Sequence, residues 1–323
     1  MRKRYLWSCC IVVFLFLLCA CQKGKEIQDA EEQDTMAEGQ DASWDMHITE
    51  ETIEVDGLAQ EYTFLFLTDT HMVVPGGEDS DQIEEYTEQR LAEFRNEEDV
   101  ASAEQFEQWM NYANRQQVNA LLLGGDIIDC PTAAGIGHLE EHLEKLEMPY
   151  LYTPGNHDWT FPWEYMTQYG RESYRPMLEP YMQSNCAIHE LEFEDLIIVA
   201  VDNSTNQIAP EAMEEYRTIL EKKKPVIVML HVPLLTQSVL TKAKEVWSSG
   251  VVLGGGNYGG IYPDEVSTEF IELTTAEDSP VVAVLAGHVH FYDRDGINER
   301  IIQIVGDAGY KGSAVLLRVN GKN

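Results

Sequence analysis

The sequence predicts an α/β fold in which buried sheets are layered with helices. Short, almost continuous apolar runs, such as 62–67 and 281–285, recur along the chain. Such runs are typical of strands that are covered on both faces. Amphipathic segments with helical spacing separate several of these runs, and no internal repeat is present. Strands that alternate with helices favour a layered α/β domain.

Residues 1–20 have the pattern of an export signal. A basic start at positions 2–4 precedes an apolar run from Cys9 to Ala20, which is short for a membrane span. The segment Leu18-Cys19-Ala20-Cys21 resembles the lipobox of bacterial lipoproteins. That resemblance implies cleavage before Cys21, acylation of Cys21, and anchoring in a lipid bilayer on the extracytoplasmic side, at the cell surface or the periplasmic face. An ordinary signal peptide or an uncleaved anchor is the alternative.

Residues 21–46 are predicted to form an acidic, disordered tether. The segment is rich in Glu, Asp, Gln, Ala and Gly and has almost no large apolar residues. Such a composition cannot bury enough surface to fold, and its like charges extend the chain. A folded pattern begins near His47, so we assign residues 47–323 to one domain.

Most elements of this domain follow from the spacing of apolar residues. Residues 80–116 are acidic on one face, with Leu91, Phe94, Phe106 and Trp109 as inward candidates, and this pattern predicts helix. Apolar stripes predict two further helices, and apolar runs predict strands. The expected strands are 52–55, 62–67, 118–123, 150–153, two within 186–201, 226–230, 281–285, 301–305 and 314–319, and the further helices are 137–146 and 210–222.

The net charge of −34 limits the classes of partner. A basic face for nucleic acid is not expected, because the electrostatic part of nucleic-acid binding needs clustered Lys and Arg. A phosphate substrate is still compatible with this charge, since bound divalent cations dominate the local field of a site. The acidity otherwise favours solubility.

Five segments share one design, in which an apolar strand leads into a turn that carries metal-binding side chains. Asp69 and His71 stand two residues apart at a strand end, so both can project to the same side. Ligands at the carboxyl ends of neighbouring strands converge on one crevice. In chain order the segments are Asp69-Thr70-His71, Gly125-Asp126-Ile127-Ile128-Asp129, Gly155-Asn156-His157-Asp158, His231 and Gly287-His288-Val289-His290.

These side chains suit transition metals. Imidazole and carboxylate ligands favour Mn, Fe or Zn, and the lack of thiolate ligands argues against a closed structural zinc site. The ligands are too many for one ion, so a pair of ions sharing one carboxylate fits better.

The five segments, in this order, resemble the motifs of the calcineurin-like metallophosphoesterase family, which are D-x-H, G-D-x-x-D, G-N-H-D/E, H and G-H-x-H. The resemblance extends from Asp69 to His290. It implies a four-layer α/β/β/α sandwich with a metallophosphoesterase catalytic domain. It also implies hydrolysis of a small phosphoester by a hydroxide that two metal ions generate from water.

The resemblance also implies a role for each motif residue. Asp126 would bridge the two ions, and His157 would be the catalytic imidazole, oriented by Asp129. The role of Asp158 is left open. The remaining ligands would be Asp69, His71 and His290 for the first ion, and Asn156, His231 and His288 for the second.

One departure from the family bears on the substrate. Protein phosphatases of the family continue the second motif with Arg-Gly, which supplies a phosphate clamp, whereas Cys130-Pro131 stands here. We therefore expect a phosphodiesterase, with a phosphomonoesterase as the alternative. The alternative of another class is a non-catalytic surface lipoprotein that binds a ligand on the same fold. The oligomeric state is left open.

Several other patterns have two interpretations. The segment His138–His142 matches the H-x-x-E-H zinc-protease pattern, but we expect an exposed acidic face of an amphipathic helix. Gly254–Gly260 is expected to be a mobile loop near the substrate. The aromatic residues within 159–165 form either a wall for the leaving group or part of the core. Whether Cys130 and Cys186 pair is left open.

Overall fold

The computed structural model describes residues 44–76 and 80–322. The predicted signal, residues 1–20, and most of the predicted tether, 21–46, lie outside the described residues. Among the described residues, no helix has the length and apolar character needed to cross a membrane. The folded unit includes Trp44, which is buried and packs edge-on against Trp109 at a centroid distance of 5.4 Å.

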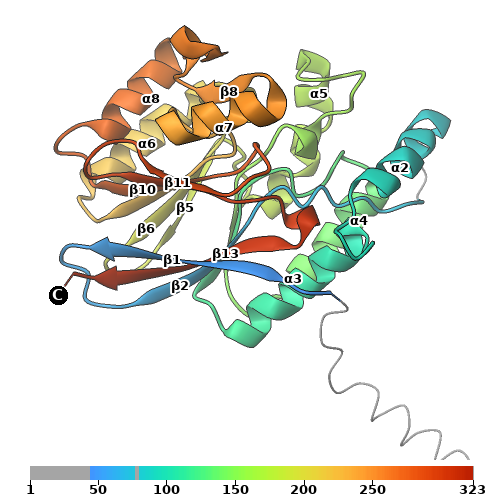
Figure 1. Ribbon diagram of the computed structural model, residues 1–323, viewed down its shortest axis with the longest axis horizontal. Helices are drawn as coiled ribbons and strands as arrows, with labels where there is room; N and C mark the ends of the chain where they lie inside the picture. The colour runs from blue at the N-terminus through green and yellow to red at the C-terminus, as the bar shows by residue number, and fades with distance from the viewer. Residues whose placement is uncertain (1–43, 77–79, 323) are drawn as a thin grey trace, which may run out of the picture. The chain divides into compact units, whose positions relative to one another are not determined.

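Two main sheets form the centre of the described part (Figure 1). The first has the strand order β1-β13-β2-β3-β4, and the second has the order β11-β12-β10-β7-β6-β5. The first sheet consists of β1 (His47–Val55), β2 (Tyr62–Leu67), β3 (Ala120–Leu123), β4 (Tyr150–Tyr152) and β13 (Ser313–Gly321). The second consists of β5 (Ile188–Glu192), β6 (Ile197–Val201), β7 (Val226–Met229), β10 (Val281–Ala286), β11 (Asp293–Gly296) and β12 (Ile302–Val305).

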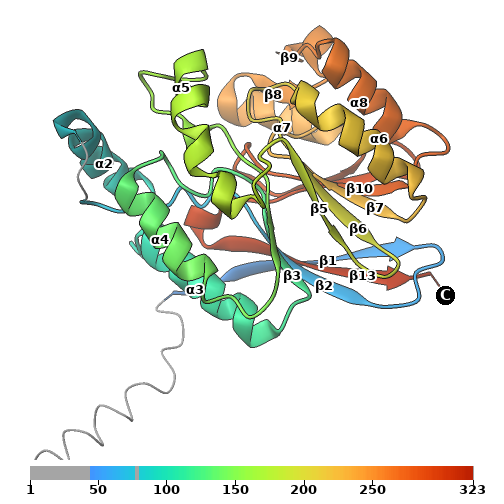
Figure 2. The ribbon, with the colours of Figure 1, turned by 180° about the vertical axis from the view of Figure 1, so that it is seen from behind.

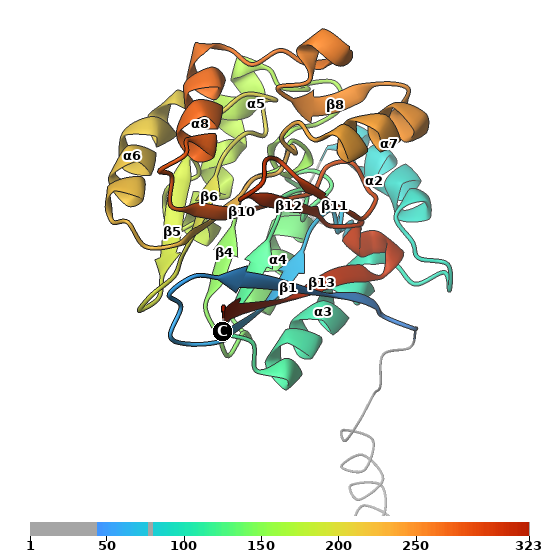
Figure 3. The same ribbon diagram turned by 60° about the vertical axis from the view of Figure 1, so that its left-hand side comes forward.

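The two sheets pack face to face, and helices cover their outer faces (Figures 2 and 3). Along β2, Phe64 and Phe66 point into the core between the sheets, whereas Leu65 and Leu67 point to the outer core. Both faces of the strand are therefore buried, which explains its continuous apolar run. The outer helices are α3 (Ser102–Gln116) and α4 (Ala133–Leu143) over the first sheet, and α6 (Met213–Glu221) and α8 (Glu265–Thr275) over the second. The predicted α/β/β/α sandwich is confirmed.

The long predicted helix at 80–116 is two helices, α2 (Asp81–Glu93) and α3. A tight turn between them is held by the Asn96 side chain, whose Oδ1 accepts a hydrogen bond from the Val100 backbone N–H at 2.8 Å. Asp99 in this turn has a φ of 64°, which no α-helix accommodates. The single helix was therefore a wrong prediction, since local turn chemistry interrupts a shared acidic pattern.

The expectation of an exposed acidic face at His138–His142 holds for the glutamates but not for the histidines. His142 is buried, and its ring lies 4.1 Å from that of His138 and 6.1 Å from that of Phe106. The two histidines therefore pack α4 against α3, and only the glutamates of this segment face solvent. Thr132 caps α4 by accepting a hydrogen bond from the Gly135 N–H, so the helix begins before the predicted start.

The region after His231 has more regular structure than predicted. Gly254–Gly260 was expected to be a loop, but it connects and partly forms a small two-stranded parallel sheet. This region contains α7 (Gln237–Trp247), β8 (Gly250–Leu253) and β9 (Gly260–Ile261). The other short elements are α5 (Gln168–Ser173) and the 3₁₀ turns η1 (His157–Trp159), η2 (Arg175–Met177), η3 (Glu179–Tyr181), η4 (Pro210–Ala212), η5 (Gly256–Tyr258) and η6 (Gly309–Lys311).

Parallel pairing brings the five motif segments to one edge. β2, β3 and β4 are parallel neighbours in the first sheet. β6, β7, β10 and β12 are parallel neighbours in the second. The chain segments that leave the carboxyl ends of β2, β3, β4, β7 and β10 are those that carry the candidate ligands, so they emerge on the same side of each sheet.

Candidate metal centre

The backbone is unusual at the candidate ligands. Asp69, His71, Asp126, His288 and His290 all have positive φ, between 40° and 72°. This left-handed region is sparsely populated by residues other than glycine, and occupying it costs about 1–3 kcal/mol per residue. Five such residues at one site indicate that the surrounding fold holds these side chains in a required direction.

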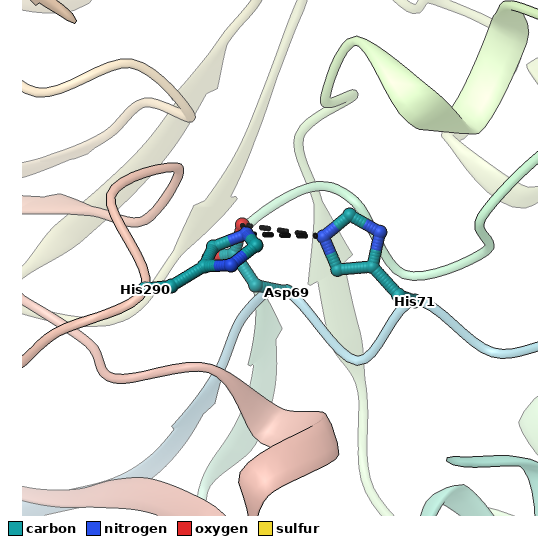
Figure 4. Close-up of side chains that lie close together, drawn as sticks. All are labelled: Asp69, His71 and His290. Atoms are coloured by element: carbon teal, nitrogen blue, oxygen red, sulfur yellow. Dashed lines mark hydrogen bonds and ion pairs between the residues drawn. The ribbon is translucent and has the colours of Figure 1, made fainter. Parts of the chain in front are cut away.

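Three side chains form the first ligand group (Figure 4). Asp69 Oδ1 lies 3.3 Å from His290 Nε2 and 4.0 Å from His71 Nε2. The two imidazole Nε2 atoms are 3.1 Å apart. Two ring nitrogens and a carboxylate oxygen therefore converge on one point, which is the arrangement that a transition-metal ion needs.

Asp126 joins the first group to a second one. Its Oδ2 lies 3.1 Å from His231 Nε2 and 3.8 Å from His71 Nε2. His288 Nδ1 lies 3.3 Å from His231 Nε2, so Asp126, His231 and His288 also converge. The position of Asp126 between the two groups fits a carboxylate shared by two ions.

Asn156 is buried in the segment that follows β4, and its Oδ1 has no hydrogen-bond partner among the described residues. The next residue, His157, donates its backbone N–H to Asp126 Oδ1 at 2.7 Å, which places the loop against the bridging carboxylate. A buried amide oxygen without a partner costs about 1–3 kcal/mol. A cation would satisfy it, so the residues present fit a dinuclear centre.

Contacts behind the ligands set which ring nitrogen faces the centre. His231 Nδ1 lies 2.9 Å from the Gly124 carbonyl oxygen, so it donates there and leaves Nε2 toward Asp126. His71 Nδ1 lies 3.2 Å from Asp129 Oδ1, which likewise leaves Nε2 toward the first group. Such contacts fix the tautomer and ring orientation that a metal ligand requires.

The electrostatics of the buried side chains suit cation binding. Burial lowers the pKa of His71 to about 4 and, with the charge of His231, lowers that of His288 to about 3. Both imidazoles are therefore neutral at pH 7, the form that binds metal. Burial disfavours the charged form of His231, yet the Asp126 carboxylate raises the pKa of His231 to about 10. Without an ion, a protonated imidazole thus supplies the positive charge that Asp126 needs.

His157 and Asp129 form a pair at the edge of the centre. His157 Nδ1 lies 3.1 Å from Asp129 Oδ1, and the side chain of His157 is 31% exposed whereas that of Asp129 is 1% exposed. Burial opposes protonation, but the carboxylates of Asp126 and Asp129 raise the pKa of His157 to about 9. His157 is therefore an imidazolium at neutral pH, and it lies within reach of a solvent-accessible substrate.

Asp158, whose role was left open, connects two ligand-bearing loops. Its carboxylate accepts hydrogen bonds from five donors at 2.7–3.0 Å. Three of these are backbone N–H groups of the loop that carries Asp126, and a fourth belongs to Gly155, before Asn156. The structure thus makes Asp158 an anchor for the loops. The donors are the N–H groups of Asp126, Ile127, Ile128 and Gly155, and the hydroxyl of Tyr152.

Two motif glycines are required by close approach. A Cβ atom on Gly155 would lie 2.2 Å from Asp126 Oδ1. A Cβ atom on Gly287 would lie 1.9 Å from Thr68 Oγ1 and 2.5 Å from Asp69 Oδ2. Any side chain at these positions would displace a candidate ligand, so glycine is the residue that fits.

The aromatic segment after the third motif is partly buried and partly exposed. Trp159 and Phe161 are fully buried in the core. Trp163 and Tyr165 are 39% and 52% exposed, and the wall for the leaving group stays a prediction. Cys130 and Cys186, for which pairing was left open, are both buried, and they form no disulfide with each other.

Sequence reasoning missed side chains that reach the centre from outside the motifs. Phe94 stacks on His71 with ring centroids 4.4 Å apart, and the Arg90 guanidinium bonds to Asp129. Trp247 packs edge-on against His290 at 5.3 Å and donates its Nε1–H to the Val289 carbonyl at 2.9 Å. Of these three side chains, only that of Phe94 had a signal in the sequence, because its spacing predicted that it faces inward.

The chain belongs to the calcineurin-like phosphoesterase family, because the family model matches residues 62–292, more than half of the chain. It is accordingly a metal-dependent phosphoester hydrolase, and its family implies two metal ions. No curated protein sequence matches the chain.

Solved structures with a similar fold include a dimetal phosphatase from Danio rerio, with 12% identity, a TM-score of 0.48, and coverage of 77% of this chain and 88% of that one. The phosphopantetheinyl hydrolase of Mycobacterium tuberculosis has 11% identity and a TM-score of 0.41, with coverage of 79% and 92%. A 5′-nucleotidase from Candida albicans has 12% identity and a TM-score of 0.44, with coverage of 80% and 48%.

Proposed function

We propose that the chain is a phosphodiesterase that works with two ions of Mn, Fe or Zn. The observation that carries the proposal is the position of Asp126 between two ligand groups, next to the His157–Asp129 pair. Asp69, His71, Asp126 and His290 would hold one ion, and Asp126, Asn156, His231 and His288 the other. When bound, such a pair supplies an activated water and neutralises charge on the phosphate.

The side chains of this protein contribute binding and proton transfer. With its Nδ1–H donated to Asp129, His157 keeps Nε2–H available to bond a phosphate oxygen or to protonate the leaving oxygen. Asp129 holds the ring in this tautomer and stabilises its positive charge. Trp163 and Tyr165 offer exposed ring surface for an organic leaving group.

The preference for a diester rests on Cys130-Pro131, which stands in place of the Arg-Gly clamp, and on the bonding of Arg90 to other side chains. A monoester carries two negative charges, which guanidinium groups bind well. Arg90 is the arginine bonded to Asp129, and it donates both Nε and Nη2 to that carboxylate and Nη1 to Glu93. Each of its three nitrogens thus already donates to a carboxylate, which favours a substrate with a single charge.

Paired assays test this preference. The protein, loaded with Mn, Fe or Zn, is given p-nitrophenyl phosphate and bis-p-nitrophenyl phosphate under identical conditions. We expect kcat/KM to be at least about tenfold higher for the diester, which corresponds to about 1.4 kcal/mol of transition-state stabilisation. A monoester preference of similar size would instead favour the phosphomonoesterase. Hydrolysis of neither ester with any metal would favour a non-catalytic binding lipoprotein.

We also propose that acylated Cys21 anchors the protein to a bilayer outside the cytoplasm. The support is the pattern at Leu18–Cys21 and the acidic segment that separates it from the folded unit. The full chain produced in bacteria should partition into the membrane fraction, and Cys21→Ala should lose the lipid and leave that fraction. The anchor would be contradicted if the variant stayed in the membrane fraction as much as the parent does and the parent carried no lipid label.

A further inference from the structure

Arg90 reaches the centre from α2, a helix that carries none of the family motifs. Its Nε lies 2.8 Å from Asp129 Oδ2, and its Nη2 lies 2.9 Å from Asp129 Oδ1. This is a two-point contact between planar groups, which fixes orientation as well as charge. Asp129 itself is 1% exposed, so the contact is shielded from water on the carboxylate side.

The guanidinium is contacted by neighbours in α2 and at its C-terminal cap. Tyr86 and Phe94, one helical turn before and after Arg90, place their rings 5.5 Å and 4.3 Å from its central carbon. Glu93 accepts from the remaining nitrogen. Within α2 itself, only Thr87 is buried. Core packing therefore does not explain why Arg90 is directed inward, whereas its contact with Asp129 does.

One carboxylate oxygen of Asp129 contacts two imidazole rings. Its Oδ1 lies 3.2 Å from Nδ1 of the candidate ligand His71 and 3.1 Å from Nδ1 of the candidate catalytic residue His157. A small rotation of the carboxylate would lengthen one of these contacts or both. Arg90 donates a hydrogen bond to each of the two oxygens, and this two-point contact opposes the rotation.

We propose that Arg90 is a positioning residue that acts through Asp129 to orient His71 for metal binding and His157 for catalysis. The inference rests on the proposed function, because it assigns a task to the same centre. Lysine could not replace Arg90, since a single ammonium cannot span both carboxylate oxygens with fixed geometry. Only the first ligand group contains a histidine held by Asp129, so the effect on metal binding is confined to one of the two ions.

The test compares Arg90→Ala and Arg90→Lys with the unmodified protein and with Arg217→Ala. Arg217 is a matched control, because it also lies on a helix, α6, and pairs with a carboxylate, that of Glu269 on α8, outside the motif segments. Titration calorimetry with Mn²⁺ gives the affinity of each site. Thermal unfolding of the metal-free proteins gives stability, and turnover of bis-p-nitrophenyl phosphate is measured at saturating Mn²⁺.

We expect Arg90→Ala to weaken one Mn²⁺ site by about 10- to 100-fold and to leave the other within threefold. At saturating Mn²⁺, kcat should fall by about 10- to 100-fold with KM changed by less than threefold. On a logarithmic scale, the kcat of Arg90→Lys should lie less than halfway from that of Arg90→Ala to that of the unmodified protein. Added guanidinium should raise the turnover of Arg90→Ala at least fivefold. Arg217→Ala should match the parent in all three measurements.

Two results would overturn the inference. Unchanged affinity of both Mn²⁺ sites and an unchanged kcat in Arg90→Ala would mean that Asp129 keeps its orientation without Arg90. Equal weakening of both sites together with a lower unfolding temperature would mean that Arg90 supports only the fold. If the unmodified protein binds two Mn²⁺ ions but hydrolyses no ester, the proposed function fails while the calorimetry still tests Arg90.

Discussion

Asp126→Asn should reduce turnover by more than about 1,000-fold, because the bridging carboxylate is the element that the two ions would share. Its Oδ2 lies within 3.8 Å of a histidine nitrogen from each ligand group. Asparagine has nearly the same shape and can still accept the His157 N–H at its Oδ1, so the loop keeps its path. The substitution removes the negative charge without removing the hydrogen bond. Steady-state kinetics and metal analysis by mass spectrometry should show that activity and at least one of two bound ions are lost together.

The matched control for this variant is Asp195→Asn. Asp195 also accepts hydrogen bonds from backbone N–H groups, those of Ala59 and Gln60, but it lies in a connection between strands outside the motifs. It should keep two ions and full activity. Retention of more than one tenth of the parental turnover by Asp126→Asn would refute a shared carboxylate.

His157→Gln should lower kcat by about 100- to 10,000-fold while both ions stay bound. The pKa of His157, raised to about 9 by the carboxylates of Asp126 and Asp129 against the opposing effect of burial, makes it an imidazolium at neutral pH. Glutamine can hydrogen-bond to phosphate, but it can neither carry the charge nor give a proton to the leaving oxygen. Turnover of the diester with Mn²⁺, together with metal content, measures the effect.

The outcome for His157→Gln separates catalysis from metal binding. His47→Gln, on the exposed start of β1, is the control and should behave as the parent does. Loss of metal in proportion to activity would make His157 a ligand instead. Activity within tenfold of the parent would remove its catalytic role.

Local patterns in the sequence predicted a layered α/β fold and the clustering of the motif residues, whereas the four-layer arrangement was implied by the family resemblance. The apolar run Tyr62–Leu67 matches β2 at both ends, and each motif follows directly from a strand in a parallel pair. Parallel pairing within each sheet, and the packing of the two sheets against each other, then bring the ligands together. Here local signal and tertiary packing agree.

Other features depend on contacts that a local pattern does not contain. Arg90 has the sequence context of a surface arginine paired with Glu93, and its contact with Asp129 spans 39 positions. His142 looked exposed because glutamates surround it, yet it packs against Phe106 of a neighbouring helix. The break at Asn96–Asp99 arises from a side-chain-to-backbone hydrogen bond that competes with helix. In the first two cases the structure depends on a partner distant in sequence. In the third it depends on a turn inside a segment whose composition favours helix.

The most direct test of the dinuclear centre is anomalous diffraction at the manganese edge from crystals grown with Mn²⁺. Two peaks should appear about 3.5–4 Å apart, with the Asp126 carboxylate between them. One should be bound by Asp69, His71 and His290, and the other by Asn156, His231 and His288. A single peak, or peaks away from these side chains, would contradict the account.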